Sequence, residues 1–316
     1  MKIDWIAGTG GIGRGEIFRL IGNHTLGREE SRSAYLTGYK DYCKAHIILS
    51  YVAKLFEGKI PVYAVGMVGN DERGKGIKAE MQSSFIKTDF VIENDFPTTY
   101  SVCFLYEDGN GGNITTCNDA SSKVTAKFLI ESIDEIVKTM GYDGMFLGAP
   151  EVSLSQRAKA LEYAKSKGIY TVCSVLSGEA KEFLENNYAK HCDLLAVNID
   201  EITAIGKGEK DRGIKEVQKL NPSITLVVTD GKNGVTVYEG QKTYKIPAIK
   251  VEVVSTAGAG DALLGGTMYG LANGLKIEDS VKIGVVCSSF AVESAHTIPE
   301  NFSKEKLERR IKEIIK

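Results

Sequence analysis

The chain has 316 residues, a formal net charge of −2, and 43% hydrophobic and 25% charged residues, which is the composition of an ordinary soluble globular protein. It has no basic stripe and no apolar run near the roughly 18 residues that span a bilayer, so we expect neither nucleic acid nor a membrane as a partner. The N-terminus lacks the long apolar core of a signal peptide, and the six cysteines form no Cys-x-x-Cys pair, so we expect a cytoplasmic protein with reduced thiols.

A glycine-rich turn follows the first predicted strand, residues 3–7. Its sequence, Gly8-Thr9-Gly10-Gly11-Ile12-Gly13, matches the G-x-G-x-x-G pattern of dinucleotide-binding folds. That fingerprint also requires a second strand ending in an acid about 20 residues later, and residues 22–28 do not read as a strand. We therefore interpret the glycines as the end of a first strand that reaches a ligand cleft. Arg14 follows this turn, where it would either meet a carboxylate or phosphate of the substrate or lie solvated in a loop.

Apolar runs and helical periods alternate along the rest of the chain. The predicted strands are residues 60–67, 144–147, 169–175, 194–197 and 224–228, and the predicted helices are residues 71–84, 155–167 and 179–187. Continuous apolar strands separated by helices favour a mostly parallel sheet that is covered on both faces.

One stretch departs from this pattern. Residues 99–105 and 113–116 alternate in polarity around a turn at residues 107–112, which indicates an antiparallel hairpin. Together with part of residues 12–36, this hairpin would form a small sheet beside the main one.

The most informative segment is residues 251–266. Its β-branched start predicts a strand, the small residues 256–260 predict a turn, and Asp261 begins a helix. The free N–H groups of the first helical turn suit an anion, and small residues let the backbone approach it closely. An acid beside an anion site is suited to removing a proton from a nucleophile that attacks the anion. The alternative is a common strand–helix turn with an ordinary first-turn aspartate.

Polar residues also follow two of the predicted strands. Asn198 and Glu201 come after residues 194–197, at the strand end that faces the cleft in open α/β sheets. Because magnesium keeps several waters, one glutamate there is enough to bind it; the alternative is a helix-capping box. The loop Thr229-Asp230-Gly231-Lys232-Asn233-Gly234 follows residues 224–228 and also suits a plain hairpin turn.

These motifs together resemble those of the ribokinase-like (PfkB) carbohydrate kinases. The family's C-terminal signature, Asp-Thr-x-Gly-Ala-Gly-Asp, is matched by Thr256, Gly258, Ala259, Gly260 and Asp261, while Ser255 replaces its first aspartate. Residues 198–201 resemble the family's Asn-x-x-Glu motif, and residues 229–234 resemble its Thr-x-Gly-x-x-Gly nucleotide loop. Residues 68–74 resemble the tail of its N-terminal signature, Val-Gly-x-Asp-x-x-Gly. The motifs also come in the family's order.

The resemblance implies a fold and an activity. The implied fold is an α/β three-layer sandwich with a mostly parallel central sheet and a small β-sheet lid. It forms a single domain of residues 1–316, whose lid uses parts of residues 12–36 and 91–118. The implied activity is ATP-dependent phosphorylation of a hydroxyl on a sugar or sugar-like small molecule, by a phosphotransferase with an alcohol acceptor. The resemblance also implies a homodimer that forms through the lid.

The resemblance assigns roles to residues as well. The implied catalytic base is Asp261, helped by the N–H groups of Ala257 to Gly260, which stabilise the charge on the transferred phosphoryl group. The implied catalytic residues are Asp261, Gly258, Ala259 and Gly260, and the implied ATP-binding residues are Asn198, Glu201, Thr229, Gly231, Gly234, Thr256 and Ala257. Mg²⁺ is expected near Glu201, held through water. Many members also use a monovalent cation beside the signature, and Ser255 leaves that dependence open.

The substrate-binding half departs from the family pattern. Gly38-Tyr39 replaces the Gly-Gly pair of the N-terminal signature, and His46 replaces its asparagine. Asn113 stands where many members carry a sugar-binding arginine. We therefore expect Arg14, His46 and Asn113 to contact the substrate, while His46 fits a buried core histidine equally well.

Two alternatives therefore stay open. The first is a nucleoside or sugar-phosphate kinase of the same family, for which the available cations are Arg14, Arg19, Arg28 and Arg32. The second is a ligand-binding or sensor protein on the same fold that no longer catalyses. The intact Asp261 argues against a sensor, and the altered substrate half argues for one.

Overall fold

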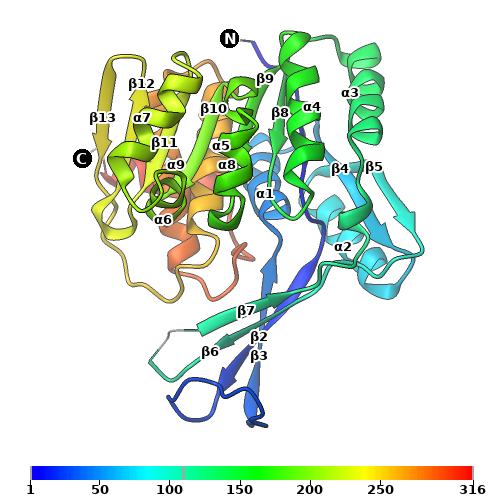
Figure 1. Cartoon of the computed structure of the whole chain (residues 1–316), viewed down its shortest axis with the longest axis vertical. Helices are drawn as coiled ribbons and strands as arrows, with labels where there is room; N and C mark the ends of the chain where they lie inside the picture. The colour runs from blue at the N-terminus through cyan, green and yellow to red at the C-terminus, as the bar shows by residue number, and fades with distance from the viewer. Residues whose placement is uncertain (1, 109–110, 315–316) are drawn as a thin grey trace.

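Two β-sheets of unequal size organise the described part of the chain, residues 2–108 and 111–314 of the computed structural model (Figure 1). The strands of the larger sheet are β1 (Trp5–Thr9), β4 (Val62–Gly69), β5 (Ile86–Asn94), β8 (Gly144–Gly148), β9 (Tyr170–Ser174), β10 (Leu194–Asn198), β11 (Thr225–Thr229), β12 (Val235–Glu239) and β13 (Lys242–Ile246). The strands of the smaller sheet are β2 (Arg14–Leu20), β3 (Ala34–Tyr42), β6 (Ser101–Leu105) and β7 (Gly111–Thr115).

Helices fill most of the rest of the described chain. The α-helices are α1 (Lys44–Phe56), α2 (Glu72–Ser83), α3 (Ala126–Met140), α4 (Leu154–Ser166), α5 (Ala180–Glu185), α6 (Ile199–Ile205), α7 (Lys210–Leu220), α8 (Ala259–Ala272), α9 (Ile277–Val292) and α10 (Lys304–Ile314). None of these described helices has the length and apolarity that crossing a membrane requires.

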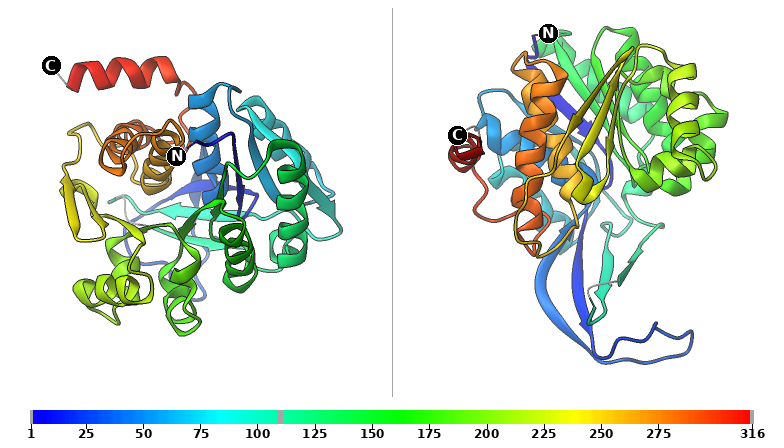
Figure 2. Two further views of the ribbon diagram at one scale, coloured as in Figure 1. Left: turned by 90° about the horizontal axis from the view of Figure 1, so that it is seen from above. Right: turned by 90° about the vertical axis from the view of Figure 1, so that its left-hand side faces the viewer.

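The larger sheet forms the middle of three layers. Its order is β13-β12-β11-β10-β9-β8-β1-β4-β5, and neighbouring strands are parallel except at β11–β12 and β12–β13. Helices α1, α2, α8 and α9 pack on one face, and α3 to α7 pack on the other (Figure 2). Adjacent residues of β1 show the alternation, because Ile6 belongs to the first core and Trp5 to the second. The predicted α/β sandwich with a mostly parallel sheet is confirmed.

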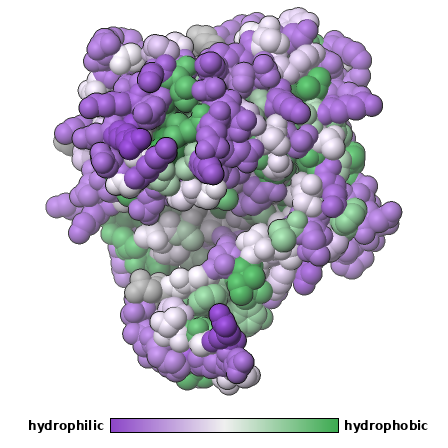
Figure 3. Space-filling view, in the orientation of Figure 1, coloured by the Kyte–Doolittle hydropathy of each residue, from purple (hydrophilic) through white to green (hydrophobic). Residues whose placement is uncertain are grey.

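The carboxyl ends of the parallel strands lie along one side of this sheet, which is called here the strand-end edge. Thr9 of β1 pairs with Gly148 of β8, and Asn198 of β10 pairs with Thr229 of β11, so the strands of each pair end together there. The smaller sheet begins five residues after β1 ends, which places it at this same edge (Figure 1). The surface is hollowed between the body and the smaller sheet (Figure 3). Ligands bind at this edge in open α/β sheets.

The smaller sheet combines two hairpin-like pairs. Its order is β3-β2-β6-β7, in which β2 runs antiparallel to β3 and parallel to β6, and β6 runs antiparallel to β7. The predicted hairpin of residues 99–105 and 113–116 is therefore present as β6 and β7, although residues 109 and 110 of its turn lie outside the described residues. The β2–β3 register shifts near Gly38, whose positive φ of 74° suits glycine.

The side of the smaller sheet that carries Asp41 is called here the Asp41 face. Asp41 of β3 pairs with Gly15 of β2, and its carboxylate accepts a hydrogen bond from Cys103 Sγ of β6 at 3.0 Å. Gly15 is required between them, because an added Cβ would lie 2.0 Å from Ser101 Oγ. The missing side chain on β2 therefore leaves room for the polar groups of β3 and β6 on either side of it.

The opposite side is called the Glu80 face, because it packs against Glu80 of α2. The Glu80 carboxylate accepts three hydrogen bonds, from Arg14 Nη1 at 2.8 Å, Lys40 Nζ at 2.9 Å and Tyr42 Oη at 2.8 Å. These donors come from both β2 and β3, so this one carboxylate anchors both strands to the body.

The predicted strand at residues 251–254 is wrong. The segment is irregular, Val253 and Val254 are 61% and 58% exposed, and the N–H of Val254 donates to the carbonyl of Val292 at the end of α9. β-Branched composition favours a strand only where another strand offers a partner. Here β13 already forms the edge of the sheet and ends at Ile246.

Candidate active site

Asp261 lies in the first turn of α8, which begins directly after a glycine turn. Gly258 precedes the helix with a φ of 74°, and a Cβ there would lie 2.9 Å from Thr297 Cβ, so both conformation and space require glycine. Asp261 is only 8% exposed. Burial raises the pKa of its carboxyl, and Lys44 lowers it.

The backbone of the turn offers free hydrogen-bond donors. Ala257 N–H donates to Ser255 Oγ at 3.2 Å, and Ala259 N–H donates to the Thr256 carbonyl at 3.4 Å. Within the described residues, the N–H groups of Gly258 and Gly260 have no hydrogen-bond partner. Of the four N–H groups predicted to bind the anion, these two are available at the positive end of α8, where backbone donors and helix dipole both favour negative charge.

Lys44 is a second charged group of this site, and the sequence analysis missed it. It is the first residue of α1, and its Nζ lies 3.6 Å from Asp261 Oδ1. The Asp261 carboxylate raises the pKa of Lys44 to about 12, with smaller contributions from Glu201 and Glu151. Lys44 is therefore a fixed cation among carboxylates. No local pattern identifies it, because it reaches Asp261 only when α1 packs against α8.

Glu151 is a second residue that the sequence analysis missed, three positions after the end of β8. Its pKa is raised to about 7, mainly by burial and with smaller contributions from Asp261 and Asp41, although Lys44 lowers it. Its Oε2 is buried without a hydrogen-bond partner among the described residues. Gly11 makes room for it, because a Cβ there would lie 2.5 Å from Glu151 Cβ. The sequence carried a usable signal, since this acid follows a buried strand, as Glu201 does.

Asp41 is the remaining acid that the sequence analysis missed. Burial raises the pKa of Asp41, while Cys103 and Lys44 lower it. Its own charge raises the pKa of both Glu151 and Asp261, so it lies within electrostatic reach of them. The Asp41 face therefore lies on the side of the smaller sheet that is directed toward Asp261.

Asn198 and Glu201 satisfy both interpretations of their spacing. They form a capping box, in which Glu201 N–H donates to Asn198 Oδ1 and Asn198 N–H donates to Glu201 Oε2, both at 2.8 Å. Glu201 is also only 7% exposed, and burial raises the pKa of its carboxyl. Lys44 lowers that pKa and Asp261 raises it, so both lie within electrostatic reach of Glu201. The capping box uses Oε2 alone, so Oε1 is free to accept a water.

The loop after β11 is a tight hairpin connection, as its sequence also allowed. It joins β11 to the antiparallel β12, and Gly231 and Gly234 adopt φ angles of 47° and 89°. A Cβ on Gly234 would lie 2.2 Å from the Ile246 carbonyl oxygen. Thr229 ends β11 beside Asn198, and its hydroxyl donates to the Val197 carbonyl at 3.5 Å. The two motifs therefore stand side by side at the strand-end edge.

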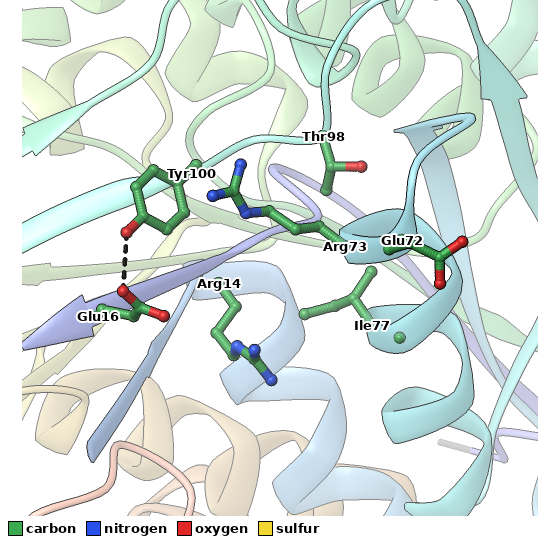
Figure 4. A pocket seen from close by; sticks show the side chains of 8 residues that line it. Arg14, Glu16, Glu72, Arg73, Ile77, Thr98 and Tyr100 are labelled. Carbon is green, nitrogen blue, oxygen red and sulfur yellow. Dashed lines mark hydrogen bonds between the residues drawn. The ribbon is translucent and has the colours of Figure 1, made fainter. Parts of the chain in front are cut away.

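Arg14 lies on the Glu80 face, away from Asp41. There it pairs with Glu80 and lines a cavity of about 240 Å³ between the smaller sheet and α2 (Figure 4). In this cavity Tyr100 donates to Glu16 at 3.0 Å, and the Arg73 guanidinium carbon lies 4.1 Å from the centre of the Tyr100 ring. The structure thus favours neither a solvated loop arginine nor one that is free for a substrate beside Asp261.

The other two substrate candidates differ in position. His46 is 1% exposed on α1, its ring centroid lies 4.5 Å from that of Tyr42, and burial lowers its pKa to about 3. This placement favours the buried core histidine. Asn113 is exposed on β7, opposite Cys103 in the register, so it shares the Asp41 face. Its Oδ1 accepts a hydrogen bond from Thr115 Oγ1 at 3.0 Å.

Comparisons with known proteins match this architecture. A model of the family described as pfkB family carbohydrate kinase matches residues 48–303. The ribokinase of Lactococcus lactis subsp. lactis is 27% identical over 237 residues, which cover 73% of this chain and 73% of that protein. The structure of Arabidopsis thaliana ribokinase complexed with ribose and ATP has a TM-score of 0.76 and 18% identity, covering 98% of this chain and 99% of that chain. The nucleoside kinase of Methanocaldococcus jannaschii has a TM-score of 0.77 and 19% identity, covering 99% of both chains.

Proposed function

Since the chain belongs to the pfkB family of carbohydrate kinases, we propose that it transfers a phosphoryl group from ATP to a hydroxyl of a sugar or sugar-like small molecule. One observation carries this proposal. The buried carboxylate of Asp261 lies 3.6 Å from Lys44 Nζ and directly beside the free N–H groups of Gly258 and Gly260. A base, a cation and an anion site thus meet at the strand-end edge, where phosphoryl transfer needs all three.

In the proposed reaction, Asp261 accepts the proton of the substrate hydroxyl. The hydroxyl oxygen bonds to the γ-phosphorus of ATP, and the bond from that phosphorus to the bridging oxygen breaks, which releases ADP. The N–H groups of Gly258 and Gly260 stabilise the negative charge on the transferred group. Ala259 holds the turn in place through its bond to Thr256.

The nucleotide is proposed to bind along the strand-end edge. The residues proposed to contact ATP are Asn198, Glu201, Thr229, Gly231, Gly234, Thr256 and Ala257. Arabidopsis thaliana ribokinase, which shares the fold, has been solved with ribose and ATP, and this supports ATP as the donor. The pairing of Asn198 with Thr229 brings two of these motifs together.

Glu201 fits a magnesium ion held through water. Its Oε1 is free of the capping box, and its carboxylate lies near the anion site. No group of three or more His, Cys, Asp or Glu within the described residues is arranged to hold a metal, so the ion would take its other ligands from water and phosphates. When bound, Mg²⁺ neutralises charge on the ATP phosphates.

The smaller sheet is proposed to act as a lid, and also as a dimer contact. Closure of the Asp41 face over the substrate would exclude water, with Asn113 contacting the substrate from β7. On the opposite face Leu36 and Ile114 are 58% and 65% exposed. Apolar residues are also visible on the side of the smaller sheet that Figure 3 shows. Exposed apolar groups of this kind mark contact surfaces. Light scattering should give twice the chain mass, and Leu36→Glu should give the monomer.

The kinase proposal is tested by measuring ADP release with sugars, nucleosides and sugar phosphates as acceptors. The nucleoside kinase of the same fold justifies the nucleosides. We expect at least one acceptor to release ADP above background and Asp261→Asn to stop it. If no acceptor does so, and ligands bind equally well to the parent and to Asp261→Asn, the protein is a sensor and the kinase proposal is wrong.

A further inference from the structure

Acidic side chains outnumber the one cation in the space around Lys44. Asp41 raises the pKa of both Glu151 and Asp261, Asp261 raises that of Glu151, and Lys44 is the cation that lowers the pKa of all three acids. A substrate hydroxyl placed at Asp261 lies among these carboxylates. A phosphate ester that entered the same space would meet like charges, and such juxtaposition is strongly unfavourable in a buried site.

The four arginines that made a sugar-phosphate substrate possible in the sequence analysis do not lie beside Asp261. Arg14 is on the Glu80 face, where it pairs with Glu80, and Arg32 pairs with Glu30 in the loop between β2 and β3. Arg28 is exposed in that same loop. Arg19 lies four residues beyond Gly15 on β2, which is about 13 Å further from the body at about 3.3 Å per residue. None of the four therefore balances the acids near Asp261.

Asp41 is incompletely satisfied by the protein. Its Oδ2 accepts the Cys103 thiol at 3.0 Å, whereas its Oδ1 has no hydrogen-bond partner in the part of the chain that the structure describes. A thiol is a weak donor, so this bond orients the half-buried carboxylate and leaves its other oxygen able to accept from a ligand. A hydroxyl or amino group from the substrate would supply the missing donor.

We propose that Asp41 determines substrate specificity by accepting a hydrogen bond from a hydroxyl or amino group of an unphosphorylated substrate, and that the acids around Lys44 reject phosphorylated ones. This inference rests on the kinase function proposed above. Of the functions left open by the sequence, the inference favours a sugar or nucleoside kinase over a sugar-phosphate kinase. Asp41 is distinct from the base, because it lies on the smaller sheet rather than beside the glycine turn of α8.

The first experiment compares matched acceptors. Each sugar or nucleoside is assayed beside its own phosphate ester and, where one exists, its amino derivative. We expect kcat/KM for the best unphosphorylated acceptor to exceed that of its phosphate ester by about 100-fold or more. A phosphate ester that is the better substrate overturns the proposal.

The second experiment removes the charge of Asp41 with little change in shape. In Asp41→Asn, the KM for the acceptor should rise by about 10- to 100-fold, the value of a hydrogen bond to a charged group. The KM for ATP should stay close to that of the parent. The ratio of kcat/KM between an acceptor and its phosphate ester should become smaller. Glu16→Gln, on the opposite face of the same sheet, is the matched control and should leave both KM values unchanged. An unchanged acceptor KM in Asp41→Asn overturns the proposal.

Two further measurements distinguish a contact between Asp41 and the substrate from a purely structural role of Asp41. Cys103→Ser keeps a donor for Asp41 and should retain the acceptor KM better than Cys103→Ala does, and equal losses would mean that the pair is only structural. Calorimetry can measure the binding of the same acceptors to Asp261→Asn and to the double variant that also carries Asp41→Asn. Because neither protein is expected to turn over, this measurement tests the contact by binding alone. If ligands bind and Asp41→Asn weakens them, the specificity role stands even where the kinase proposal fails; if binding is equal, the role is wrong.

Discussion

The turn before α8 and the smaller sheet form the two halves of the candidate site in different ways. In the first half, residues 256–260 and Asp261 are contiguous, so one short segment supplies both the backbone donors and the acid. In the second half, Asp41 and Cys103 lie 62 residues apart and meet only because β3 and β6 flank β2. A contiguous site can be recognised from a motif, whereas a site shared by distant strands requires the strand order.

The two halves should also respond differently to substitution. Changes at the α8 turn should lower kcat for every acceptor, because that turn contacts the transferred phosphoryl group. Changes on the Asp41 face of the smaller sheet, or at the Glu80 contacts that anchor this sheet, should alter the KM of the acceptor and leave that of ATP unchanged. The following predictions test this division, from the largest expected effect to the smallest.

Asp261→Asn should have the largest effect. We expect kcat to fall by about 10²- to 10⁴-fold, the usual contribution of a general base, while ATP affinity changes little because the side chain keeps its size. Single-turnover ADP release and ATP titration measure the two quantities. Asp200→Asn, an exposed acid on α6, is the control and should behave like the parent. If the kcat of Asp261→Asn is within a few-fold of that of the parent, Asp261 is not the catalytic base.

Gly258→Ala should distort the anion site. The new Cβ would meet Thr297 at 2.9 Å, and φ is 74°, so we expect a loss of about 1–3 kcal/mol of stability. The displaced turn should also lower kcat by about 10- to 100-fold. Gly76→Ala is the control, because it lies within α2 and its Cβ would meet no atom within 4 Å. Equal melting temperatures and rates for Gly258→Ala and Gly76→Ala would contradict this account.

Glu151→Gln should reveal the cost of a buried acid through the pH dependence of stability. The folded pKa of Glu151 is raised to about 7 from 4.5, so folding favours its protonated form. Its contribution to stability is full below the unfolded pKa and is lost as the pH rises from about 4.5 to 7. Glu151→Gln should therefore be more stable than the parent by ~1–3 kcal/mol at pH 8, with a smaller difference at pH 5. Thermal or denaturant unfolding at both values measures it, and a difference that does not grow with pH would disprove the shift.

Glu80→Gln should have the smallest effect and should act through the smaller sheet. Losing the charge weakens the contacts to Arg14, Lys40 and Tyr42, so we expect the acceptor KM to rise by about 2- to 5-fold and stability to fall by less than ~1 kcal/mol, because the cluster is partly exposed. The KM for ATP should not change. Glu93→Gln breaks a similar pair with Lys78 that does not involve the smaller sheet, and it serves as the control. A change in kcat alone would show that the two halves are not separable in this way.

The fold could be predicted from the sequence because its signals are local. Buried strands read as continuous apolar runs, helices show their period, and the hairpin of β6 and β7 shows alternation. The prediction failed at residues 251–254, where the local preference for a strand meets no free edge of the sheet. Secondary structure follows local preference only where the tertiary structure supplies a partner.

The sequence by itself determined the order of the motifs, the glycine turn and the acid that follows it, because these lie within a few residues of one another. Only the tertiary structure brought Lys44, Glu151 and Asp41 near Asp261. It also paired Arg14 with Glu80 and buried His46. The physical reason is that the register of parallel strands and the packing of α1 on α8 decide which distant charges share one buried space. In that space their mutual fields, rather than their residue types, set their protonation.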